Sequence, residues 1–171
     1  AGRAAVVALL KNYLEPGYEA SALEIQKLAY FLQEAGQPLK LKFEAHQYGP
    51  YAENLNHVLQ AMEGQFTRGY GDRNRTPELT LVDGAYEEAR QVLDADPELS
   101  ARLDKVADLI EGFESPYGLE LLATAHWVMK AERSVAGYPD AIVRGVREWN
   151  ERKRRIFKVP HIRTAWERLI E

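Results

Sequence analysis

Residues 21–36 read SALEIQKLAYFLQEAG and carry the strongest folding signals in the chain. Ser21 and Glu24 have the spacing of a capping box, in which each side chain accepts a hydrogen bond from the other residue's amide. Gly36 is the residue type that most often ends a helix. The apolar side chains between these ends cover more than one face, which predicts a central helix packed from several sides.

Outward from this helix, the chain repeats one pattern. Apolar residues recur at helical spacing, and proline, glycine or capping residues bound each run. The pattern predicts helices at residues 3–14, 52–62, 83–93, 97–113, 116–131, 139–149 and 160–169, with Asp83, Asp96 and Ser115 as caps.

Three short segments favour strands instead. Residues 39–44 alternate apolar and charged side chains, and residues 66–70 and 79–82 are two further candidates. We expect these segments to form one small antiparallel sheet, which must pack on helices to be stable. The predicted fold class is mainly α with a small antiparallel β-sheet, in a single compact helical domain that spans residues 1–171.

Charge is distributed unevenly along the chain. The formal net charge is −4, yet residues 83–120 carry 11 acidic and 3 basic side chains, and residues 144–171 carry 4 and 9. Two solvated surfaces of opposite sign are the simplest interpretation. The run from Arg152 to Arg155 either contacts phosphates or caps a helix C-terminus and neutralises the acidic segment.

The usual signatures of catalysis and metal binding are missing. The chain has no cysteine, so disulfides and thiolate chemistry are excluded. Walker, GxGxxG, GxSxG and HExxH motifs are also absent. His126 lies on an apolar helical stripe, which favours a hydrogen-bonded core histidine. We therefore expect no metal and no nucleotide cofactor. No apolar run has the length of a membrane span, and we expect no membrane partner.

One segment is unusually rich in tyrosine. Between residues 45 and 72 the chain gathers His46, Tyr48, Tyr51, His57, Phe66, Arg68, Tyr70 and Asp72 around turn glycines. Tyrosine and arginine are enriched at interface hot spots. Buried rings with solvated hydroxyls at the edge of a sheet explain the same composition equally well.

Several runs of sequence resemble one family. They are IQKLAYFLQEAG (25–36), YGPYAENL (48–55), MEG (62–64), GYGD (69–72), AHWV (125–128) and WNERKR (149–154). Together they are similar to the C-terminal domain of the antitoxin DarG, and the resemblance extends from about residue 20 to the end.

The resemblance implies a binding role in the cytoplasm. DarG counteracts DarT, a toxin that ADP-ribosylates thymidine in single-stranded DNA, and the family's N-terminal macrodomain removes the modification. Nothing in this chain resembles a macrodomain. We therefore expect a toxin-binding domain with a DarT-type protein partner, no direct contact with nucleic acid and no hydrolase activity.

The expected contacts follow from the resemblance and the tyrosine-rich segment. We expect Tyr48, Tyr51, Arg68, Tyr70 and Asp72 at the toxin interface. Glu87, Glu88 and Asp94 would offer carboxylates in place of DNA phosphates. Occlusion of the toxin's NAD⁺ pocket and locking of a toxin loop are alternative modes of inhibition.

Two other functions remain open at this point. A nucleic-acid-binding regulator would use the small sheet and the basic C-terminal helices, although a pI of about 5.7 argues against it. An enzyme would have a site around His46, Tyr48 and Tyr51, but no nucleophile, base and orienting group can be named together.

Overall fold

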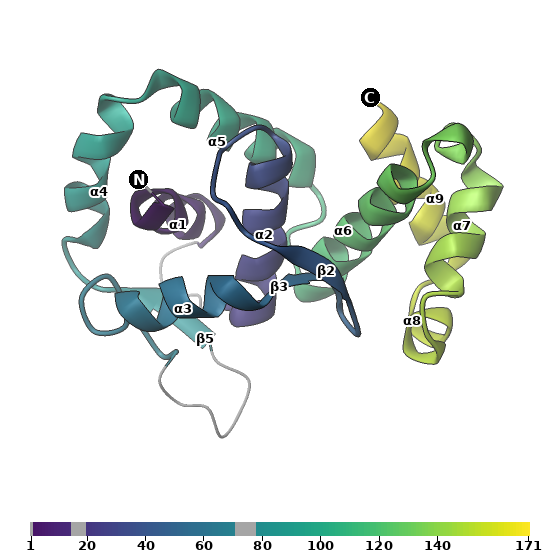
Figure 1. Cartoon of the computed structure of the whole chain (residues 1–171), viewed down its shortest axis with the longest axis horizontal. Helices are drawn as coiled ribbons and strands as arrows, with labels where there is room; N and C mark the ends of the chain where they lie inside the picture. The colour runs from purple at the N-terminus through teal and green to yellow at the C-terminus, as the bar shows by residue number, and fades with distance from the viewer. Residues whose placement is uncertain (1, 15–19, 71–77) are drawn as a thin grey trace.

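The computed structural model describes residues 2–14, 20–70 and 78–171 (Figure 1). The helices in these ranges are α1 (Gly2–Tyr13), α2 (Ala22–Glu34), α3 (Glu53–Met62), α4 (Ala85–Asp94), α5 (Pro97–Ile110), α6 (Pro116–Ala131), η1 (Arg133–Val135), α7 (Pro139–Arg147), α8 (Glu151–Ile156) and α9 (Val159–Ile170). The strands are β1 (Ala20–Ser21), β2 (Phe43–His46), β3 (Gly49–Ala52), β4 (Thr67–Arg68) and β5 (Glu78–Leu81). The predicted fold class is confirmed. None of these helices is long and apolar enough to cross a membrane.

The central helix is α2, as predicted. Ser21 Oγ accepts from the Glu24 amide at 3.1 Å, and Glu24 Oε1 accepts from the Ser21 amide at 3.1 Å. Every residue from Glu24 to Leu32 is buried, because α1, α5, α6 and β3 all pack on this helix. The helix ends where Gly36 adopts a left-handed conformation with φ of 112°.

The strands form two small sheets, which corrects the expected single one. In the first sheet β5 lies between β1 and β4, and in the second β2 pairs with β3 as an antiparallel hairpin. The segment before β2 is not a strand. Its backbone groups bond to side chains, since Gln33 holds both the N–H and the C=O of Leu41 at 2.8 and 2.9 Å. Lys40, with φ of 60°, also breaks the extended conformation.

The caps of α5 and α6 are confirmed, and that of α4 is wrong. Asp96 accepts from the Leu99 amide at 3.1 Å, and Ser115 accepts from the Gly118 amide at 2.9 Å. The N-cap of α4 is Gly84 rather than Asp83, because a turn places that left-handed glycine directly before the helix.

The C-terminal helices form one end of the molecule, and α6 connects them to the rest. Figure 1 shows α7, α8 and α9 on one side of α6, and α1, α4 and α5 at the opposite end. The buried apolar residues of both ends belong to one continuous cluster. Helix α8 was not predicted, because its four consecutive basic residues show no apolar stripe. Its start is fixed by Asn150 Oδ1, which accepts from the Lys153 amide at 2.8 Å.

Candidate functional site

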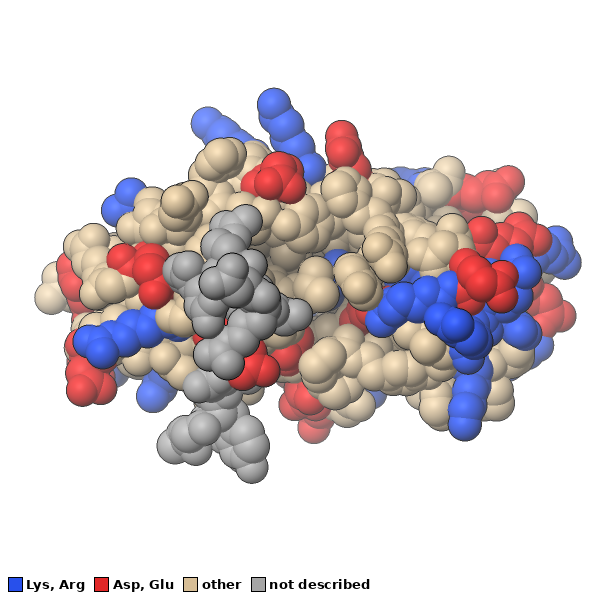
Figure 2. Space-filling view, turned by 90° about the horizontal axis from the view of Figure 1, so that it is seen from below, with Lys and Arg blue, Asp and Glu red and all other residues tan. Residues whose placement is uncertain are grey.

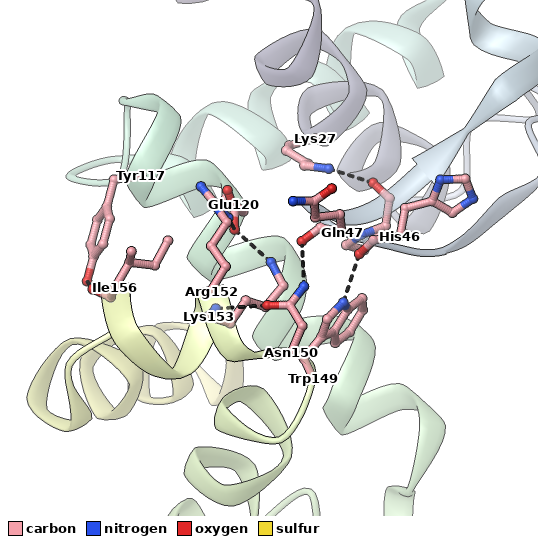
Figure 3. A network of polar contacts seen from close by, with 11 residues as sticks. Lys27, His46, Gln47, Tyr117, Glu120, Trp149, Asn150, Arg152, Lys153 and Ile156 are labelled. Atoms are coloured by element: carbon pink, nitrogen blue, oxygen red, sulfur yellow. Dashed lines mark hydrogen bonds and ion pairs between the residues drawn. The ribbon is translucent and has the colours of Figure 1, made fainter.

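A cleft lies where α2, α6, α8 and the β2–β3 turn meet (Figure 3). Its volume is about 240 Å³. The lining residues are Ser21, Leu23, Glu24, Lys27, Tyr48, Pro116, Glu120 and Arg152. The cleft therefore combines carboxylates, cations and one exposed aromatic ring from segments that are far apart in the sequence.

Glu120 is the centre of the charged network in this cleft. Its Oε2 accepts from Arg152 Nη1 and from Lys153 Nζ, both at 2.6 Å. The Lys153 side chain is fully buried, and this burial lowers its pKa, while the hydrogen bond to Glu120 opposes the change. Such short, charge-assisted hydrogen bonds are stronger than neutral ones. Glu120 thus holds α8 against the first turns of α6.

Lys27 is a buried cation on the opposite wall. It is 2% exposed, and its Nζ donates to the Pro50 carbonyl at 2.7 Å. Burial lowers the pKa of Lys27 to about 7, helped by the charge of Lys153 and opposed by that of Glu120. Desolvation disfavours the charged form of an amine, so Lys27 exchanges a proton near neutral pH.

Gly49 allows the hairpin to approach these groups closely. It has a φ of 103°, and an added Cβ would lie 2.8 Å from Thr124 Oγ1 and 3.6 Å from Lys27 Nζ. Thr124 Oγ1 is buried and has no hydrogen-bond partner within the described part of the chain. A side chain at position 49 would therefore push the hairpin away from Lys27.

The tip of the hairpin is fastened to the start of α8. Trp149 Nε1 donates to the His46 carbonyl at 2.8 Å, and Asn150 Nδ2 donates to the Gln47 carbonyl at 3.0 Å (Figure 3). The Arg152 guanidinium lies 4.5 Å from the centre of the Tyr48 ring. These contacts position Tyr48 and Arg152 together at the rim of the cleft.

Of the expected interface residues that the structure describes, only Tyr48 lines this cleft. Tyr51 is half-buried, stacks on His46 with ring centres 5.0 Å apart, and accepts from Asn56 Nδ2 at 2.6 Å. The structure thus brings His46 and Tyr51 together but pairs Tyr48 with Arg152 instead.

The other expected residues are scattered. Arg68 is exposed on β4, an edge strand, whereas Tyr70 is 3% exposed and belongs to the core. Truncation of this buried ring would leave a cavity, so we expect Tyr70→Ala to lower thermal stability. Asp72 lies outside the described residues.

The three expected acidic contacts lie on α4. Glu87, Glu88 and Asp94 are all exposed, and Asp94 is 3.9 Å from Arg90. Because α4 is at the opposite end of the molecule from α8, these carboxylates do not belong to the cleft (Figure 1). Whether any of the expected residues contacts a protein partner stays a prediction.

The sequence did not predict that the residues of the cleft lie together. Lys27 stands among buried apolar neighbours in α2, which was an available signal. Arg152 and Lys153 were noticed as a basic run, and neutralisation of the acidic segment is what their bonds to Glu120 achieve. The expected core role of His126 is supported, since its Nδ1 is 2.7 Å from the Tyr30 hydroxyl and burial lowers its pKa.

Comparison with known proteins gives three similar relatives, while no protein-family model matches the chain. The chain is 43% identical over 171 residues to the "DNA ADP-ribosyl glycohydrolase" of Thermus aquaticus, covering 99% of the chain and 46% of that relative. It is 40% identical over 185 residues to proteins of the same name from Mycobacterium tuberculosis and Mycobacterium bovis, covering 52% of each. The chain thus spans about half the length of the curated relatives it matches.

These names correct the functional expectations. The relatives are named as hydrolases, so the expected non-enzymatic, toxin-binding antitoxin domain is contradicted, and an operon regulator does not fit either. The expectation rested on the resemblance to the DarG C-terminal domain, on the missing catalytic motifs and on the tyrosine-rich segment. A site such as Lys27, Glu120 and Arg152, built across the fold, leaves no motif in the sequence.

Proposed function

We propose that this chain acts in the removal of ADP-ribose from DNA, and that the cleft binds the ADP-ribosyl group. The relatives' name supports the reaction. The observation that carries the proposal is the cleft itself, where two cations line a cavity and a third, Lys153, lies directly behind it. The same proposal places the protein in the cytoplasm of a bacterium, where its DNA substrate lies.

The cleft suits the charge of such a ligand. ADP-ribose contains a diphosphate with two negative charges, and a guanidinium matches phosphate oxygens with paired hydrogen bonds. Arg152 stands at the rim and is 30% exposed, so it can reach an incoming phosphate. The Glu24 carboxylate is already engaged, because it accepts from the Tyr13 hydroxyl and from the Ser21 amide and hydroxyl.

Two side chains fit the chemical step. Hydrolysis of a glycosidic bond passes through a cationic sugar, which a nearby carboxylate stabilises. Glu120 is the carboxylate in position for this role. A general acid or base works best with a pKa near the working pH, and Lys27 meets that condition. Water supplies the hydroxyl to the sugar carbon, and the departing base receives a proton.

The test is release of ADP-ribose from an ADP-ribosylated oligonucleotide by the purified chain, measured by mass spectrometry. We expect Lys27→Met to lower the rate by about 10²-fold or more, the usual contribution of a general acid or base. Lys105→Met, on the exposed side of α5, is the matched control and should retain the wild-type rate.

Two results would refute the proposal. One is no release by the folded chain together with no binding of ADP-ribose in calorimetry. The other is equal activity of the Lys27 and Lys105 variants. Circular dichroism melting of each variant separates loss of chemistry from loss of folding.

A further inference from the structure

A second group of cations lies outside the cleft, on the end of the molecule formed by α7 and α8. Its members, which we call the basic face, are Arg144 and Arg147 on α7, Arg154 and Arg155 on α8, and Lys158 just beyond α8. Figure 2 shows Lys and Arg side chains gathered at this end, with Asp and Glu side chains among them. All five are exposed except Arg147, which is half-buried.

Most of these cations form no ion pair with the residues that the structure describes. Arg154 is 3.4 Å from Glu151, an exposed pair of little strength. The other four have no carboxylate within ion-pair distance in the part of the chain that the structure describes. Arg163 and Arg168 on α9, by contrast, are paired with Asp140 and Glu171. The unpaired cations are thus concentrated on α7, on α8 and just beyond α8.

The basic face is continuous with the cleft through α8. Arg152 and Arg155 are three residues apart on one helix, so their side chains are neighbours on its surface. Arg152 points to Glu120 and the cleft, while Arg155 is exposed. A polyanion lying along α7 and α8 would therefore reach the rim of the cleft with its next charged group.

We propose that the basic face binds the phosphate backbone of DNA and positions the modified nucleotide at the cleft. This inference rests on the proposed function, which supplies DNA as the substrate. Exposed cations on two adjacent helices can contact successive phosphates of one strand, and such contacts carry no sequence information. The alternative ligand of the basic face is an acidic protein segment, and the experiment distinguishes it from DNA.

The experiment measures binding to a fluorescein-labelled, single-stranded oligonucleotide without ADP-ribose, by anisotropy over a range of salt. It therefore reports on DNA binding whether or not the chain hydrolyses anything. For the double variant Arg155→Glu, Lys158→Glu we expect at least tenfold weaker binding at 50 mM salt. The slope of log affinity against log salt should fall by about 1.4, since each phosphate contact on a single strand contributes about 0.7.

The matched control reverses two exposed cations at the opposite end, Arg90→Glu and Lys105→Glu, and should bind like the wild type. Arg155→Ala with Lys158→Ala gives a milder variant should the reversal disturb folding. Three results would each overturn the inference. They are an equal loss of DNA affinity in the control, no binding of DNA at 50 mM salt, and tighter binding of poly-glutamate than of DNA. On modified DNA, the Arg155 and Lys158 variant should raise KM and leave kcat unchanged.

Discussion

Glu24 and Glu120 are two carboxylates of the same cleft, equally buried at 7% exposure, that are satisfied in opposite ways. Glu24 is held by neutral donors, most of them within its own helix cap. Glu120 is held by two cations from α8, more than 30 residues away in the sequence. The contacts of Glu24 are mostly local, so the sequence predicts them. The contacts of Glu120 form only once the C-terminal helices have docked.

The largest loss of stability should appear when Glu120 loses its charge. Glu120→Gln leaves Lys153 buried without its partner, and breaking a buried pair in this way costs about 3–5 kcal/mol. Urea denaturation measures this loss. Adding Lys153→Met should restore much of the stability, since both charges are then gone. A Glu120→Gln variant as stable as the wild type would show that the pair contributes little.

The pH dependence of stability should report on the protonation of Lys27, which faces Glu120 and Lys153. Its pKa is lowered from 10.5 to about 7, so above pH 7 the unfolded chain binds a proton that the folded chain does not. The free energy of unfolding should therefore rise between pH 7 and 9.5. The slope from this residue is at most about 1.4 kcal/mol per pH unit.

Lys27→Met should remove this rise, and urea denaturation at several pH values measures it. Lys105→Met provides the control, because its side chain is exposed in the folded chain as well as in the unfolded one. An unchanged slope in the Lys27 variant would show that the amine keeps its proton in the folded state.

Removing the local helix cap that involves Glu24 should cost less stability. Ser21→Ala removes the hydroxyl that caps α2, and loss of such a cap costs about 1 kcal/mol. Thermal melting should show a modest decrease. Ser21→Asp is the control, because aspartate can accept the same hydrogen bond from the Glu24 amide. A loss as large as that of Glu120→Gln would mean that the start of α2 also depends on distant contacts.

This contrast explains how much the sequence could predict. The caps at Ser21, Asp96 and Ser115 were predictable because their partners lie three residues away. The strand expected before β2 failed because Gln33, on another element, takes the backbone bonds of Leu41. The same limitation applies to the cleft, whose residues come from α2, α6 and α8 and share no local pattern.

The smallest effect on stability should come from Arg152, although it touches the same carboxylate as Lys153. Arg152 is 30% exposed, so solvent screens its charge, and Lys153 remains to hold Glu120 after Arg152→Ala. We expect a loss of stability of at most about 1 kcal/mol, as for exposed ion pairs, even with the contact to Tyr48 removed.

The same substitution, Arg152→Ala, should weaken binding of ADP-ribose at least tenfold in calorimetry, because Arg152 is the cation proposed to receive its phosphates. Arg154→Ala, the nearby exposed residue of α8, should change neither quantity appreciably. A large loss of stability with unchanged binding would reverse the assignment: Arg152 would be a structural clamp like Lys153 and would not receive the phosphates.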